Sequence, residues 1–313
     1  MKYFIVLTVF AAFAANAQYK SENLKLDPQA AVTQNKYTYE NLRLYPIRAN
    51  KTFEAEHKNL GTYVSLKEAL EKRKIIVSEK SRQGTVNSLL IENVSNDTIM
   101  ILSGEVVQGG KQDRVVGEDV ILYPKSGRKD VSVFCVEHGR WSPKNGDTSF
   151  KDYFSISTNE VRKAATVTKN QGEVWEKVAE TTSKNRAQTS TGTLTALKES
   201  QTLSNELKRY TEHFQEALAD DKTVIGLVAV SGDRILGCDM FASHAIFSTY
   251  LPGLLNSYST EAITSGKPAS ISYEKVEEYL NDIIADEARQ EEVVEKKGVM
   301  LKQGTKKIHI STF

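Results

Sequence analysis

The chain has 313 residues, of which 40% are hydrophobic and 26% are charged, and its formal net charge is +1 at pH 7. This length is enough to bury a large core. The near balance of 41 basic and 40 acidic residues gives no overall field that would attract nucleic acid or anionic lipid. We therefore expect no nucleic-acid partner, and any recognition of an anion must be local.

The first residues have the parts of a secretory signal peptide: Lys2, an apolar run over residues 3–15 and a small-x-small cleavage site that ends at Ala17. The run is too short to cross a bilayer, which favours removal over retention as an N-terminal anchor. No cysteine follows the site to carry a lipid. We predict that residues 1–17 are a signal peptide and that the mature chain is periplasmic or secreted, with no membrane partner.

Two regions of different character follow the signal peptide. Residues 18–40 are polar without a clear period, which predicts a poorly ordered leader. Residues 41–313 contain no Pro- or Gly-rich linker and are expected to form a single α+β domain. Within them, Asn41–Arg48 alternates like a strand that ends at Pro46. The capping box that starts at Ser65 predicts a helix over residues 65–73, followed by a strand over residues 74–78.

The segment Val86–Trp141 is the richest in strand-forming residues. Val86–Val94 and Thr98–Leu102 flank a Ser-Asn-Asp turn, which predicts a hairpin. Further strands are predicted over residues 104–116, with an interruption at Gly109-Gly110, and over residues 120–123 and 131–136. Short, evenly spaced strands favour an antiparallel sandwich or barrel-like sheet.

Helices dominate the second half, which makes the expected fold an antiparallel β-rich core with several packed helices. An apolar stripe from Leu203 to Leu218 predicts an amphipathic helix. Further predicted elements are a helix around Val174, a loop over residues 189–195, a hairpin over residues 224–237, a helix from about Ser243, a helix over Tyr273–Arg289 and closing strands within Val293–Phe313. Asp239, before the helix that starts near Ser243, is expected to cap it.

Two segments concentrate glycine and charge at strand ends: Gly104–Arg114 and Cys135–Trp141. Gly109 and Gly110 can arrange successive N–H groups as an anion-binding nest. Arginine grips carboxylate or phosphate with paired bonds, and tryptophan stacks on planar groups. The predicted ligand-binding residues are Gly109, Gly110, Lys111, Gln112, Arg114, Glu137, Arg140 and Trp141.

Strand parity limits which side chains of these segments can act together. On an extended strand, His138 and Arg140 face one way, whereas Cys135 and Glu137 face the other. Cys135 and His138 are therefore poorly placed as nucleophile and base. The five histidines are isolated in sequence, so we expect no metal and no cofactor. The candidate acid–base catalysts are the carboxylates Glu105, Asp113 and Glu137.

The two cysteines, Cys135 and Cys238, leave their pairing open. Export permits a disulfide. Their apolar neighbours fit buried free thiols equally well.

The same motifs carry a family resemblance. The segments Gly104–Arg114 and Cys135–Trp141, with Gln171–Trp175 and Gly237–Phe241 after them, resemble the ARG and Rhodanese-Phosphatase-superfamily-associated domain family. The resemblance covers roughly residues 41–265. It implies no assigned activity, and the family's genomic association with ADP-ribosylglycohydrolase and rhodanese/phosphatase domains hints at nucleotide-sugar or phosphate-bearing ligands.

The chain departs from the family pattern at two site positions. His138 stands where the family commonly has Gln, and Asp113 stands where it commonly has Asn. Neither an imidazole nor an ionised carboxylate is then a family requirement at these positions. Cys238 lies outside the family motif, which counts against an obligatory bridge to Cys135.

Three functions fit these residues. The favoured one is binding of a polar or anionic small molecule by the Lys/Arg/Gly cluster. A hydrolase of a phosphate- or sugar-bearing small molecule would need Glu105, Asp113 or Glu137 to converge with the arginines in a closed cleft. A non-catalytic structural or interaction protein would instead bury those charges in mutual pairs.

Overall fold

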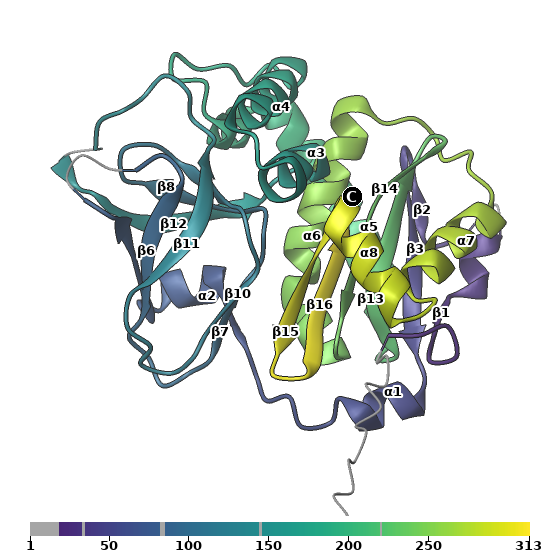
Figure 1. Ribbon diagram of the computed structural model, residues 1–313. Coiled ribbons are helices and arrows are strands. Elements are labelled where there is room, and N and C mark those ends of the chain that lie inside the picture. Colours follow the sequence, from purple (N-terminus) through teal and green to yellow (C-terminus); the bar gives the residue numbers. More distant parts are fainter. Residues whose placement is uncertain (1–18, 33–34, 82–84, 144–145, 220) are drawn as a thin grey trace, which may run out of the picture.

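The computed structural model describes residues 19–32, 35–81, 85–143, 146–219 and 221–313, and the predicted signal peptide lies outside these ranges. The described residues form two lobes that stand side by side, a barrel and a seven-stranded sheet (Figure 1). The fold is the predicted α+β class with antiparallel sheets. That the chain from residue 41 onward is one domain stays a prediction.

The barrel lobe is a closed barrel in the strand order β11-β6-β5-β12-β8-β9, and its strands are β5 (Ile75–Glu79), β6 (Ser88–Asn93), β8 (Glu105–Gly109), β9 (Arg114–Val116), β11 (Lys129–Cys135) and β12 (Ser149–Ile156). A smaller sheet shares its core and contains β4 (Val64–Ser65), β7 (Ile99–Ile101) and β10 (Val120–Leu122). The predicted capping box is confirmed, because Ser65 accepts a hydrogen bond from Glu68 N (3.3 Å) at the start of α2 (Leu66–Glu71).

The hairpin expected between β6 and β7 is wrong. β6 pairs with β5 and β11, whereas β7 pairs with β10 and, in parallel, with β4. The reason lies at Asn93, whose Nδ2 donates to the carbonyls of Asp97 (2.7 Å), Leu122 (3.1 Å) and Tyr123 (3.0 Å). These bonds tie the turn to the end of β10, so the chain leaves the barrel after β6 instead of folding back on it.

The sheet lobe has the order β1-β3-β13-β14-β16-β15, with β2 on the β3 side. The hairpin predicted around residue 232 is confirmed as β13–β14, and the closing strands are β15 and β16. The strands are β1 (Leu24–Leu26), β2 (Thr38–Tyr39), β3 (Leu42–Ala49), β13 (Val224–Ser231), β14 (Arg234–Phe241), β15 (Gly298–Gln303) and β16 (Lys306–Thr312).

The expectation of a poorly ordered leader is wrong for its described residues. β1 pairs with β3, a 3-10 helix η1 covers Pro28–Ala31, and Tyr19 is buried with its ring 5.1 Å from that of Phe53. β3 also continues past Pro46. Since β1 pairs only as far back as Ile47, the missing N–H of Pro46 is not needed there, and its carbonyl accepts from the N–H of the residue after β1 (2.8 Å).

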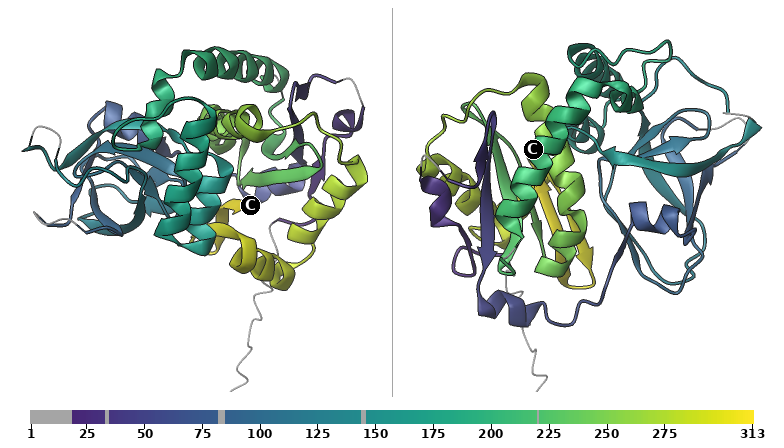
Figure 2. Two further views of the ribbon diagram at one scale, coloured as in Figure 1. Left: turned by 90° about the horizontal axis from the view of Figure 1, so that it is seen from above. Right: turned by 180° about the vertical axis from the view of Figure 1, so that it is seen from behind.

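Helices cover both faces of the seven-stranded sheet (Figures 1 and 2). On one face α5 (Gln201–Leu218) packs on α6 (His244–Ser265), and α6 also contacts β12 of the barrel. The other face carries α7 (Tyr273–Ile283) and α8 (Glu287–Lys297). The predicted single helix over residues 273–289 is thus two helices, because Asp286 caps α8 by accepting from Arg289 N (2.9 Å).

The remaining helical elements lie outside these two layers and are α1 (Lys51–Glu56), α3 (Asn159–Lys163), the π-helical turn η3 (Ala164–Thr168), α4 (Gln171–Lys184) and the 3-10 helix η4 (Leu194–Glu199). No helix in the described part of the chain combines the length and apolar character that crossing a membrane requires.

Candidate functional site

The two glycine- and charge-rich segments meet at one end of the barrel. β9 pairs with β11, which sets Arg114 opposite Cys135, and Val136 N donates to Asp113 O (3.0 Å). We call Glu79, Gln112, Asp113, Arg114, Glu137 and Arg140 the arginine cluster. All but Arg140 are buried, and the side chain of Arg140 is only 10% exposed. These two segments, which are separate in sequence, therefore lie side by side in the fold.

The N–H groups of Gly109, Gly110 and Lys111 do not converge on one anion, because each donates to a different acceptor of the chain, and Gly110 N donates to Ser149 O (3.0 Å). Gly109 N donates to Asp113 Oδ1 (3.1 Å), and Lys111 N donates to Glu79 Oε1 (3.0 Å). Gly110 has φ +45°, and a Cβ there would lie 2.3 Å from the ring of Phe150. Glycine is required at this position for close packing against β12.

Arg114 is fully buried, and its polar partners come from two strands and from the turn before β9. Its Nη1 donates to Gln112 Oε1 (3.1 Å) and lies 3.0 Å from Cys135 Sγ, while Nη2 is 3.5 Å from Glu79 Oε1. The exposed ring of Trp141 covers its guanidinium at 5.6 Å. Burial raises the pKa of Cys135 to about 11 despite this arginine, so the thiol stays protonated at neutral pH.

Arg140 joins the carboxylates of the cluster. The strand parity that would keep it away from Glu137 is wrong, because β11 ends at Cys135 and the chain turns. Arg140 Nη2 lies 2.5 Å from Glu137 Oε2 and 3.4 Å from Asp113 Oδ1, and Nη1 donates to Gly110 O (2.7 Å). Burial would raise the pKa of Glu137, but the hydrogen bonds from Arg140, Asp113 N and Thr191 together with the charge of Arg140 outweigh burial, so the pKa is lowered.

Asp113 links the cluster to the threonine-rich segment. Its Oδ2 accepts from the hydroxyls of Thr193 and Thr195, both at 2.9 Å. A β-bridge between Glu137 and Thr193 and a bond from Leu194 N to Val136 O (2.9 Å) hold the same segment. The predicted loop is therefore fastened to the barrel just before η4.

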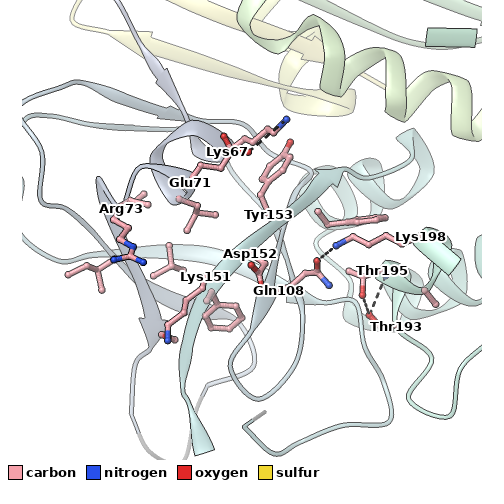
Figure 3. A pocket seen from close by; sticks show the side chains of 18 of the residues that line it. Lys67, Glu71, Arg73, Gln108, Lys151, Asp152, Tyr153, Thr193, Thr195 and Lys198 are labelled. Atoms are coloured by element: carbon pink, nitrogen blue, oxygen red, sulfur yellow. Dashed lines mark hydrogen bonds and ion pairs between the residues drawn. The ribbon is translucent and has the colours of Figure 1, made fainter. Parts of the chain in front are cut away.

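A large cleft opens on the other side of this segment. Its volume is about 1270 Å³, and its walls come from α2, β5, β12 and residues 189–199. Figure 3 shows Arg73 and Lys198 on opposite sides of it, with Asp152 and Gln108 between them. We call this space the barrel cleft. Sequence reasoning missed it, because its residues come from separated strands without a shared motif.

Two cations of the barrel cleft have no carboxylate partner among the described residues. Arg73 follows the end of α2 in a left-handed conformation (φ +53°) and makes no ion pair there. Lys198 donates to Gln108 Oε1, and its Nζ lies 5.3 Å from the centre of the Phe154 ring. The cleft thus offers positive charge at both sides.

Glu105 lies apart from the other two candidate carboxylates. It is 1% exposed, its Oε2 accepts from Leu102 N (2.8 Å), and it lines a cavity shared with α6. Burial raises its pKa to about 8, which keeps the carboxyl protonated at neutral pH. The structure therefore does not gather Glu105, Asp113 and Glu137 around one cleft.

The other sequence candidates have structural surroundings of their own. His138 is exposed, and its ring meets the edge of Trp175 at 4.4 Å. Cys135 and Cys238 are both buried and free, so they form no disulfide. Within the described ranges, no three His, Cys, Asp or Glu side chains are grouped to hold a metal ion.

A buried charge network between the lobes was also missed. The predicted capping role of Asp239 is wrong, because Ser243 caps α6 by accepting from Ile246 N (3.3 Å). Asp239 instead accepts hydrogen bonds from both terminal nitrogens of Arg162, from Nη2 at 2.8 Å and from Nη1 at 3.0 Å. Its Oδ1 also lies 3.1 Å from Nε2 of His309. His309 also contacts Asp119 (2.5 Å). We call Asp119, Arg162, Asp239 and His309 the interlobe network.

The interlobe network holds a charged histidine. Burial alone would lower the pKa of His309. The carboxylates of Asp119 and Asp239 beside it have the larger combined effect and raise the pKa from 6.5 to about 9. Burial would likewise raise the pKa of Asp239, whereas Arg162 and His309 hold it well below the usual range. Two cations therefore balance two anions. No local signal marks this set, because its members are far apart in sequence.

Comparison with known proteins agrees with the motifs. No curated protein and no solved structure gave a significant match. A family model, that of the ARG and Rhodanese-Phosphatase-superfamily-associated Protein domain, matches residues 31–311. This match spans both lobes, the arginine cluster and the interlobe network, and the chain therefore belongs to that family.

Proposed function

We propose that this protein binds a polar or anionic small molecule in the barrel cleft and does not transform it. The observation that carries the proposal is the pair of cations, Arg73 and Lys198, that face the cleft without a carboxylate partner among the described residues. Cations without a carboxylate partner at the rim of a concave site attract an anion and give it orientation.

The size and lining of the cleft support a small ligand. A volume of about 1270 Å³ holds a molecule of metabolite size together with water. Apolar and aromatic surface from Ile76, Phe150 and Phe154 lies between the polar groups. Such a mixture is typical of pockets that bind one organic molecule with a charged group.

In this proposal the arginine cluster does not contact the ligand but positions two residues that line the barrel cleft. Arg140 holds Asp113, and Asp113 holds the hydroxyls of Thr193 and Thr195, which line the cleft. Buried partners of this kind fix the position of binding groups. The predicted residues Arg114 and Arg140 would then act through the cleft wall.

A structural role is the second candidate, and a specific observation favours it. Arg114 and Glu137 are buried and bonded to internal partners, as a structural network requires. The hydrolase is the weakest candidate, because Glu105 lies in another cavity, and because Asp113 and Glu137, which meet at Arg140, are buried and do not line the barrel cleft.

Calorimetric titration with inorganic phosphate and with simple dicarboxylates tests the binding proposal. We expect at least one of these anions to bind, with about tenfold weaker binding in Arg73→Ala and in Lys198→Ala. The matched controls are Arg128→Ala and Lys208→Ala, whose exposed side chains lie outside the cleft lining. If no anion binds, or if the controls lose as much as the cleft variants, the cleft is not the site.

We also propose that the protein is exported. The support is the signal-like composition of residues 1–17. Mass spectrometry of the protein recovered from the expressing cells should find an N-terminus at Gln18. A product that begins at Met1 would contradict export by cleavage.

A further inference from the structure

A second cavity lies between the two lobes, where β12 of the barrel faces α6 of the sheet lobe. It has a volume of about 250 Å³. Residues 153–156 line one side, and Tyr250, Gly253 and Asn256 line the other. We call it the interlobe cavity. Cavities between two packed units are frequent ligand sites, because both sides contribute groups to one space.

The polar groups of this cavity are largely uncharged. Ser155 Oγ donates to Asn256 Oδ1 (2.7 Å), which leaves the Asn256 amide nitrogen without an acceptor among the described residues. Tyr250 donates its hydroxyl to Met100 O (2.7 Å). The one carboxyl in the lining is Glu105, and the one cation is the exposed Lys67.

Glu105 supplies an unusual group at the inner end. Because burial raises its pKa to about 8, it is a neutral acid at pH 7 and carries an O–H donor as well as acceptor oxygens. A hydrogen bond links it to Tyr153. Neutral groups that can both donate and accept match the hydroxyls of an uncharged ligand and do not favour an anion.

The aromatic lining of the cavity favours a ring. Tyr153, Phe154 and Tyr250 give it aromatic surface, and aromatic faces pack against flat apolar groups. Gly253 lets α6 approach β12 closely at the edge of the cavity. A Cβ at that position would lie 2.9 Å from Ile156 Cδ1 and 3.7 Å from the Tyr153 hydroxyl.

We propose that the interlobe cavity binds a neutral, hydroxyl-bearing ring of monosaccharide size, held by Asn256, Glu105 and the aromatic side chains. This site is distinct from the anion site proposed for the barrel cleft. It shares only Lys67, Tyr153 and Phe154 with the lining of that cleft.

The test is to titrate the protein with neutral methyl glycosides and free hexoses and to measure binding by calorimetry or by ligand-observed NMR. We expect at least one sugar to bind the unmodified protein, and Asn256→Ala to weaken it about tenfold through loss of a hydrogen bond. The matched control is Asn281→Ala, an exposed asparagine on α7. Arg73→Ala should bind the sugar normally, so a failed anion site is not mistaken for a failed sugar site.

A second variant tests the role of Glu105. Glu105→Gln keeps a neutral group with a donor and an acceptor, so it should bind the sugar at pH 7. In the unmodified protein binding should weaken as the pH rises through about 8, where Glu105 loses its proton, and the Gln variant should not show this loss. If no sugar binds, or if Asn256→Ala and Asn281→Ala bind equally, the proposed site is overturned. A pH-independent affinity would overturn the role of Glu105.

Discussion

The buried guanidinium of Arg114 shows how closely the charges of the arginine cluster depend on one another. It touches Glu79, Gln112 and Cys135 from inside the barrel end, and its side chain has no exposed surface. If the charge of Arg114 is removed, the buried carboxylate of Glu79 is left without its counter-ion. An experiment that changes Arg114 must therefore measure the free energy of unfolding separately from any loss of ligand affinity.

We predict that Arg114→Met lowers the free energy of unfolding by about 3–5 kcal/mol, the usual cost of breaking a buried ion pair. The double variant Glu79→Leu with Arg114→Met should lose less than Arg114→Met alone, because no unpaired charge remains. Urea unfolding measures both. A loss below about 1 kcal/mol in Arg114→Met would mean that the pair contributes little to stability.

Sequence could identify a candidate site residue only where the signal, such as glycine and charge at a strand end, comes from its neighbours along the chain. Gly109, Gly110 and Arg114 stood out because glycine and charge at a strand end are visible in the sequence. Sequence could not show that Glu79 and Asp113 accept hydrogen bonds from the N–H groups of this turn, since Glu79 comes from a strand some thirty positions earlier. His309 and Asp239 gave no signal as a pair for the same reason.

At the scale of elements, the segment before and within η4 is held by few but specific bonds. Thr193 and Thr195 donate to one carboxylate oxygen of Asp113, and backbone contacts, including the bond from Gly139 N to Thr191 O (2.8 Å), join the segment to the residues after β11. The segment also forms one wall of the barrel cleft. Its attachment therefore determines how rigid that wall is.

We predict that the double variant Thr193→Val with Thr195→Val speeds amide hydrogen exchange in residues 189–199 by about tenfold or more, because Asp113 loses two hydrogen bonds in a buried site. The isosteric change keeps the volume. Exchange in β13 should stay unchanged and serves as the internal reference. Equal exchange in variant and parent would show that the backbone contacts alone hold the segment.

Strands and helices were predictable to the extent that their pattern is local. The stripe in α5 and the turn between β13 and β14 gave elements that the structure confirms. The pairing of β6 was not predictable from its neighbouring turn, because Asn93 binds carbonyls near the end of β10. Parity also failed after Cys135, where the strand ends within the motif.

At the scale of the molecule, the interlobe network couples the two lobes. Asp119 comes from the barrel lobe between β9 and β10, His309 and Asp239 from the sheet lobe, and Arg162 from α3 between them. These four buried charges form ion pairs that cross between the lobes. Moving the lobes apart would leave charged groups without their counter-ions, so the network opposes their separation. Sequence analysis could not foresee this coupling.

We predict that this network makes stability fall at alkaline pH. The folded-state pKa of His309 is raised from 6.5 to about 9. Its contribution is therefore fully present below pH 6.5 and is lost as the pH rises through about 9, a loss on the order of 3 kcal/mol. The lowered pKa values of Asp119 and Asp239 act in the opposite direction, and their contribution is lost only in acid.

Urea unfolding of His309→Gln between pH 6 and 9.5 measures this effect. The variant should be less stable at pH 6 and should lose the alkaline decline that His309 causes. Glu105 titrates over part of the same range in both proteins, so the difference between the two profiles isolates His309. His138→Gln, an exposed histidine, is the control. Parallel profiles for His309→Gln and the parent would contradict a protonated His309.

Closure of the barrel has a consequence for how this protein can associate with itself. A closed barrel has no unpaired strand edge, so the six strands of the barrel offer no template for another strand. In the seven-stranded sheet β15 is the outer strand at one edge, the short strands β1 and β2 lie at the other, and β15 carries the exposed Lys302. A lysine on an edge strand discourages edge-to-edge stacking, so partly unfolded molecules would begin to aggregate at that sheet only after this charge is neutralised or β15 peels away.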